Sequence, residues 1–124
     1  MAAEPVGTFR WLVIDTVDPA ALAPFWCDLL GVTVWGWFDD NFLCLTDNEH
    51  TVPSIAFQRV PEPKSVKNRL HVDLSVADID EAVARIEALG GSALSEVRES
   101  EGYRWRVMAD PHGNEFCIAP RGDS

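Results

Sequence analysis

The chain contains two segments that resemble each other at a separation of 60 residues. Residues 9–32 and 69–92 each carry a strand-like run, an aspartate and an apolar pattern of helical spacing that ends near a glycine. Asp18 in the first segment aligns with Asp78 in the second. Because the repeat is long and occurs only twice, we expect two paired modules and not a solenoid.

Each module is expected to begin with a strand and an amphipathic helix. Asp18 is a suitable N-cap, and Pro19 is favoured in the first helical turn. Pro24 removes one helical hydrogen bond, which predicts a kink or a late start of this helix. In the second module, Asp78 and Glu81 form a pattern similar to a capping box.

Three shorter strand-like runs follow each helix. They are expected at 32–38, 42–46 and 54–60 in the first module, and at 93–97, 103–109 and 115–119 in the second. The polar stretch 61–67 holds two prolines and is expected to be a linker. The pattern predicts one α+β domain with βαβββ modules at about 8–60 and about 68–120.

Composition limits the possible partners. Twenty acidic residues against ten basic ones give a net charge of −10, which repels nucleic acid and anionic lipid. No apolar run approaches the roughly 20 residues that span a bilayer, and no secretory signal is visible. Cys27, Cys44 and Cys117 include no C-x-x-C pair, which argues against a disulfide scaffold and a zinc finger. We expect a cytoplasmic protein that binds neither nucleic acid nor membranes.

The stretch ADPHGNEFCIAP, residues 109–120, predicts a turn followed by a strand with two different faces. Residues 110–113 suit a type I turn. In the alternation that follows, Phe116 and Ile118 are expected on the packed side of the strand. Cys117 is then expected on the opposite side.

The motifs together resemble those of a known superfamily. A DP-x-x-L-A-x-FW helix, an N-R-x-H-x-D strand and a DP-x-G-NEFC ending are similar to those of the glyoxalase, bleomycin-resistance and extradiol-dioxygenase (vicinal oxygen chelate) proteins, in particular the glyoxalase-like subgroup. The resemblance covers nearly the whole chain. It implies that the two modules form a cupped, half-open mixed barrel, paired either within a chain or across a dimer. It does not specify the reaction, because this fold hosts several kinds of enzyme and drug-sequestering proteins.

Metal-using relatives hold a divalent ion through four strand residues, usually His and Glu. The resemblance places Trp11, Gln58, His71 and Cys117 at these four positions. Tryptophan has no lone pair for a metal, and glutamine offers only a neutral oxygen, whereas hard cations prefer carboxylate and imidazole. We therefore expect no metal and no other cofactor. A zinc site made of Gln58, His71 and Cys117 is the alternative.

His71 is expected on the concave side of the sheet, either as a hydrogen-bonded pocket residue or in contact with a ligand. Asp73 would suit the orienting carboxylate of a general base, although a spacing of roughly 7 Å is more typical of a solvated pair. Cys117 beside His71 also suggests a nucleophile, but no oxyanion-binding loop is identifiable. His50 and His112 lie in turn-like stretches and are expected to face solvent.

Five tryptophans among 124 residues are the most unusual compositional feature. The alternation VTVWGWF predicts that Trp35 and Trp37 share one face, where they fill the core or a dimer interface, or extend an aromatic wall from Trp11. Arg106 lies opposite Trp105 on its strand and would receive an anionic group if its face is the concave one.

Three functions are compatible with these features. The first is a homodimeric, metal-independent protein that binds or sequesters a small aromatic molecule, as bleomycin-resistance relatives do with drugs. The second is a glyoxalase-type lyase or isomerase with an atypical or absent metal site, and the third is a noncatalytic regulatory or dimerisation module. The ligand-binding candidates are Trp11, Trp35, Trp37, Gln58, His71, Arg106 and Cys117.

Overall fold

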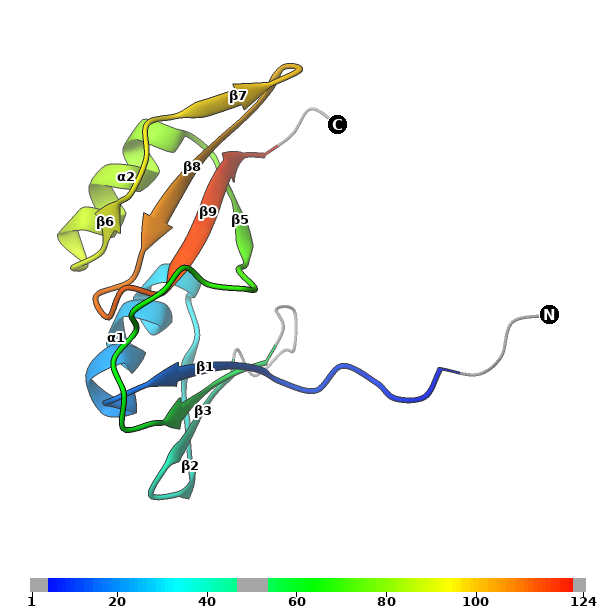
Figure 1. The fold of residues 1–124 in the computed structure, drawn as a ribbon, viewed down its shortest axis with the longest axis vertical. Coiled ribbons are helices and arrows are strands. Elements are labelled where there is room, and N and C mark those ends of the chain that lie inside the picture. Colours follow the sequence, from blue (N-terminus) through cyan, green and yellow to red (C-terminus); the bar gives the residue numbers. More distant parts are fainter. Residues whose placement is uncertain (1–4, 47–53, 122–124) are drawn as a thin grey trace.

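Two mixed sheets and two helices make up the protein (Figure 1). The computed structural model describes residues 5–46 and 54–121. The first module contains β1 (Leu12–Thr16), α1 (Pro19–Leu30), β2 (Thr33–Asp39), β3 (Phe42–Thr46) and β4 (Ile55–Arg59). The second contains β5 (Asp73–Val76), α2 (Ile79–Ala88), β6 (Ser92–Ala93), β7 (Arg98–Ser100), β8 (Tyr103–Ala109) and β9 (Glu115–Pro120). The expected α+β fold is confirmed, with the strand expected at 93–97 replaced by the short β6 and β7.

The two sheets have matching topology. Their strand orders are β1-β4-β3-β2 and β5-β9-β8-β6, and β7 pairs with β8. In each module the first strand pairs in parallel with the last, and the remaining pairs are antiparallel. Both helices lie on the left in Figure 1 and leave the other face of each sheet open in the described part of the chain.

The helix signals in the sequence act as expected. The side chains of Asp18 and Asp78 each accept a hydrogen bond from the backbone N–H three residues later, at 3.2 and 2.8 Å. Helix α1 starts at Pro19 and continues through Pro24, so its start is not late. It ends at Gly31, whose φ of +70° is left-handed and suits glycine. Neither described helix is long and apolar enough to cross a membrane.

One hydrophobic core joins the two modules. Its largest members come from both helices and from the helix-facing sides of both sheets: Leu22, Phe25, Trp26, Leu43, Leu45, Phe57, Ile86, Met108, Phe116 and Ile118. The rings of Phe25 and Trp26 in α1 lie 6.1 and 5.3 Å from the ring of Phe116 in β9. Helix α1 therefore packs on its own sheet and also on the helix-facing side of the second sheet.

A buried carboxylate in the turn before β9 stabilises the packing of α1 on the second sheet. Asp110 is 3% exposed. Its Oδ2 accepts hydrogen bonds from Trp26 Nε1 and Asn114 Nδ2, both at 3.0 Å. Its Oδ1 accepts from the backbone N–H groups of His112 and Asn114, both at 2.9 Å. Because Trp26 belongs to the first module, the Asp110 carboxylate connects the two modules directly.

His112 adds a second connection between the modules. Its Nδ1 lies 2.6 Å from the Oγ1 of Thr16, at the end of β1. The expectation that His112 faces solvent is therefore wrong, and His50 lies outside the described residues. The expected turn itself is formed, because the Gly113 N–H donates to the Asp110 carbonyl at 2.9 Å.

We predict that Asp110→Ala lowers the free energy of unfolding by about 3 kcal/mol, because charge-assisted hydrogen bonds are lost and Trp26 Nε1 is left buried without its acceptor. Guanidinium unfolding followed by circular dichroism measures the loss. The control Asp40→Ala removes an exposed carboxylate and should change stability by less than about 0.5 kcal/mol. If Asp110→Ala lowers the free energy of unfolding no more than Asp40→Ala does, Asp110 does not stabilise the contact between the modules.

Candidate functional site

The open face of the second sheet carries a pocket of about 350 Å³. Cys117 of β9 pairs with Asp73 of β5 on one side and with Val107 of β8 on the other. Because side chains alternate along a strand, Trp105 and Tyr103 share the face of Val107. The residues that line the pocket are His71, Asp73, Ser100, Tyr103, Trp105 and Cys117. His71 and Cys117 were candidates from the sequence, whereas Tyr103 was missed.

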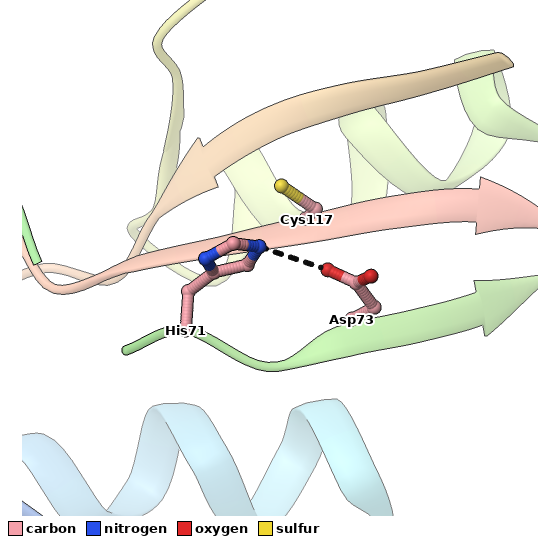
Figure 2. A group of neighbouring side chains, drawn as sticks. All are labelled: His71, Asp73 and Cys117. Carbon is pink, nitrogen blue, oxygen red and sulfur yellow. Dashed lines mark ion pairs between the residues drawn. The ribbon is translucent and has the colours of Figure 1, made fainter. Parts of the chain in front are cut away.

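Three titratable side chains meet at the floor of this pocket. Figure 2 shows His71 just before β5 and Asp73 in β5, with Cys117 projecting from the adjacent β9. Their potential ligand atoms all lie within 4.8 Å of one another. His71 Nε2 lies 3.2 Å from Asp73 Oδ1, so the two side chains are in contact and not merely neighbours along the strand. Both side chains are about half exposed, so this pair adds little to stability.

The Cys117 thiol is held in its protonated form. Burial raises the pKa of the Cys117 thiol, and the Asp73 carboxylate raises it further, while Lys67 and Arg98 act in the opposite direction. Since the thiolate is the nucleophile and the metal-binding form of cysteine, a raised pKa makes Cys117 less suited to either task. The nucleophile hypothesis gains no support from this geometry.

The strand register changes the position assigned to Gln58. Val13 pairs with Ala56 between β1 and β4, as Asp73 pairs with Cys117 between β5 and β9. Ala56 is therefore the counterpart of Cys117 in the first module, and the assignment of Gln58 is wrong by two residues. Gln58 lies on the same face one step further along β4, where its amide donates to the Arg59 carbonyl at 3.4 Å.

The side chains present fit a divalent cofactor ion poorly. Among the described residues, the cluster of ligating side chains consists of His71, Asp73 and Cys117, all from the second module. Asp73 lies with the other two, whereas Gln58, the third member of the alternative zinc trio, does not line the pocket that they share. Two of the three donors, His71 Nε2 and Asp73 Oδ1, already contact each other at 3.2 Å. Ala56 at the fourth position has no ligand atom to add.

Trp11 lies on the open face of the first sheet. Its ring meets that of Phe42 edge to face, with centroids 6.3 Å apart and 83° between the planes. Cys44 and Ala56 pair with each other between these two residues and are 2% and 0% exposed. This face therefore combines the aromatic pair and buried small side chains with the polar side chains of Asp15 and Gln58.

Trp35 and Trp37 do not share a face of the cup. The register of β2 shifts between Val34 and Gly36 and again after Trp37, which breaks the simple alternation. Trp37 pairs with Leu43, a core residue on the helix-facing side, and the Arg59 guanidinium lies 5.9 Å from its ring centroid. Trp35 lies in the first bulge and is 67% exposed. Neither lines the pocket of the second sheet.

Arg106 lies on the opposite side of the second sheet from this pocket. It pairs with Ile118, a fully buried core residue, and its Nε donates to the Ser95 carbonyl at 2.6 Å. The expectation that it receives an anionic group in the cup is therefore wrong. Arg98, which pairs with Trp105 across β7 and β8, is a cation whose charge reaches Cys117.

The segment before β5 positions His71. Glu115 of β9 accepts from Lys67 Nζ at 2.9 Å and from Lys64 Nζ at 3.4 Å, and its carbonyl accepts from Asn68 Nδ2 at 3.1 Å. Burial alone would raise the pKa of Glu115, but the hydrogen bonds from Lys67 and Lys64 lower it overall. A second cavity, of about 310 Å³, lies between this segment and β1 and also touches His71.

Known proteins resemble this chain in sequence and in fold. The family model described as "Glyoxalase-like domain" matches residues 11–119. The oxidase ChaP-H2 is 20% identical, with a TM-score of 0.67 over 95% of this chain and 96% of that chain. A glyoxalase/bleomycin resistance protein/dioxygenase family enzyme from Burkholderia phytofirmans PsJN is 19% identical, with a TM-score of 0.65 over 92% and 98%. A member of that superfamily from Sphaerobacter thermophilus DSM 20745 is 18% identical, with a TM-score of 0.69 over 94% and 98%. No curated protein sequence matches significantly.

We predict that Cys117 reacts slowly with iodoacetamide at neutral pH, with a midpoint of the pH-rate profile above the value of about 8.5 for an ordinary thiol. Mass spectrometry of digested protein separates its labelling from that of Cys27 and Cys44. Asp73→Asn removes a negative charge that raises the pKa of Cys117 and should move the midpoint to lower pH. If Cys117 is labelled rapidly at pH 7 and its rate is the same in Asp73→Asn, the thiol is not held in its protonated form.

Proposed function

Because the chain belongs to the glyoxalase-like domain family, whose fold serves many reactions, we propose a function from the pocket itself: metal-independent binding of a small planar aromatic molecule. The observation that carries this proposal is the stacked pair of Tyr103 and Trp105. Their ring centroids are 5.6 Å apart with 29° between the planes, and Tyr103 remains 54% exposed. The aromatic rings of Tyr103 and Trp105 thus lie in the same pocket as the polar side chains of His71 and Asp73.

The size and chemistry of the pocket suit such a ligand. Its volume of about 350 Å³ lies at the lower end of the range of small-molecule sites, roughly 300 to 1,000 Å³. A flat ring stacked against Trp105 gains roughly 0.5 to 1.5 kcal/mol beyond its buried area. His71, Asp73 and Ser100 offer the few polar contacts that fix orientation, and the neutral Cys117 thiol adds a soft, weakly polar surface.

A glyoxalase-type lyase or isomerase is the second candidate. The observation in its favour is the contact between His71 Nε2 and Asp73 Oδ1 at 3.2 Å, since a carboxylate that orients an imidazole is an arrangement suited to a general base. This function requires that the bound molecule be chemically changed. Mass spectrometry of the ligand recovered after incubation distinguishes the two: a binding protein returns it unaltered, and an enzyme does not.

A noncatalytic regulatory module, the third possibility from the sequence, would need no pocket of this kind. We propose a cytoplasmic homodimer, which agrees with three free cysteines and with exposed apolar side chains such as Phe9, Phe38 and Leu70.

We predict that planar aromatic compounds quench the tryptophan fluorescence saturably and that Trp105→Ala weakens their binding by about tenfold, equivalent to roughly 1.4 kcal/mol. Phe38→Ala removes another aromatic side chain, which is 81% exposed on β2 and does not line the pocket, and should leave the affinity unchanged. Equal affinities for wild type and Trp105→Ala, or no saturable binding across a varied aromatic library, would refute the proposed function.

We also predict that protein purified without added metal contains well under one transition-metal ion per chain, because the described cluster offers only three donors, two of which contact each other, and Ala56 adds no fourth. Elemental analysis measures the content. A content of about one ion per chain that is lost in His71→Ala would show that the cluster is a metal site. That result would favour the lyase or isomerase function over metal-independent binding.

A further inference from the structure

Strand β7 forms one side of the pocket in the second sheet. Ser100, its last residue, pairs with Tyr103, and both residues line the pocket. Arg98 lies two residues earlier on β7 and pairs with Trp105, so it shares the face of Ser100. Side chains paired directly across antiparallel strands have Cβ atoms roughly 5 Å apart. The Arg98 side chain is therefore placed at the edge of the pocket, beside Trp105.

A tight turn holds β7 against β8. Glu101 and Gly102 connect the two strands and have φ values of +52° and +83°. Two successive residues with positive φ are typical of the type I′ turn, whose twist matches that of the strands it joins. The register continues without a shift to the pair of Arg98 and Trp105. Backbone pairing thus fixes the position of Arg98 relative to Trp105.

The guanidinium of Arg98 is available to an external anion. The residue is exposed, and no hydrogen bond or ion pair within the described part of the chain engages its side chain. Its positive charge acts to lower the pKa of the Cys117 thiol, although burial and Asp73 raise that pKa overall. This influence agrees with a guanidinium that faces the pocket. An arginine in such a position can bind a carboxylate through two parallel N–H···O bonds.

The carboxylate of the pocket lies on the opposite side from Arg98. Asp73 belongs to β5, and β9 and β8 separate β5 from β7 in the second sheet. The Oδ1 atom of Asp73 also lies 3.2 Å from His71 Nε2. A ring over Trp105 can therefore direct an anionic group towards β7 without placing it against Asp73.

We infer that the ligand is a planar aromatic carboxylate and that Arg98 selects it, by binding the carboxylate while the ring stacks on Trp105. This ligand class rests on the proposed function. Arg106, which the sequence suggested for an anionic group, faces the helices, and Arg98 on β7 takes that role. Water and salt screen an exposed guanidinium, so Arg98 contributes to the choice between ligands more than to the total affinity.

A matched pair of compounds tests this assignment. Naphthoate carries the anionic group, and the corresponding naphthamide has nearly the same shape without the charge. Isothermal titration calorimetry at low ionic strength should show that wild type binds naphthoate about tenfold more tightly than naphthamide, because one charge-assisted pair is gained. Arg98→Gln should lower the affinity for naphthoate to that for naphthamide.

Arg104→Gln is the matched control. It removes the same charge from β8, where the exposed Arg104 alternates with Tyr103 and Trp105 and so lies on the opposite face. This variant should keep the preference for naphthoate. If wild type binds both compounds equally well, or if the preference survives in Arg98→Gln, the assignment of Arg98 is overturned while aromatic binding stands.

The labelling of Cys117 tests the position of Arg98 without any ligand. Because the positive charge of Arg98 lowers the pKa of this thiol, Arg98→Gln should move the midpoint of the iodoacetamide pH-rate profile to higher pH, opposite to Asp73→Asn. Arg104→Gln should not move it. An unmoved midpoint in Arg98→Gln would overturn the assignment, since the guanidinium would not reach the pocket. If the midpoint moves but neither compound binds, the proposed function fails and the carboxylate assignment fails with it.

Discussion

The buried carboxylate of Asp110 is the interaction on which the arrangement of the two modules depends. A charge removed from water is costly unless its lone pairs are satisfied, and here four N–H groups satisfy them. Since one donor is the indole of Trp26 in α1, the same bonds fix the first module's helix on the second module's sheet. This contact helps to set the direction in which the open faces of the two sheets point.

Local signals allowed much of the fold to be predicted from the sequence. The helix caps Asp18 and Asp78 act through residues three positions away, and the bounds 42–46 of β3 agree with the structure. The alternation at Phe116 and Cys117 also holds, because side-chain direction along an unbroken strand follows a period of two. The repeat itself correctly indicated two modules of the same order.

The errors concern interactions between distant residues. Bulges in β2 interrupt the alternation that was assumed for Trp37, and the pairing of Val107 with Cys117 decides that Trp105, not Arg106, faces the pocket. The sequence showed that those two residues have opposite faces but contained no signal for which face is open. His112 is held by Thr16, 96 positions away, a contact that no local pattern reveals.

We propose that an aromatic ring occupies the pocket beside His71 and Cys117, two of the positions at which the resemblance implied a metal site. The Cys117 thiol, whose pKa burial raises, and the His71 imidazole paired with Asp73 form the polar part of this pocket, beside the stacked rings of Tyr103 and Trp105. A crystal structure grown with a bound aromatic compound, with anomalous data collected at transition-metal absorption edges, is the most direct test. The account predicts ring density against Tyr103 and Trp105 and no anomalous peak at the floor. An anomalous peak between His71 and Cys117, with no ring density, would contradict it.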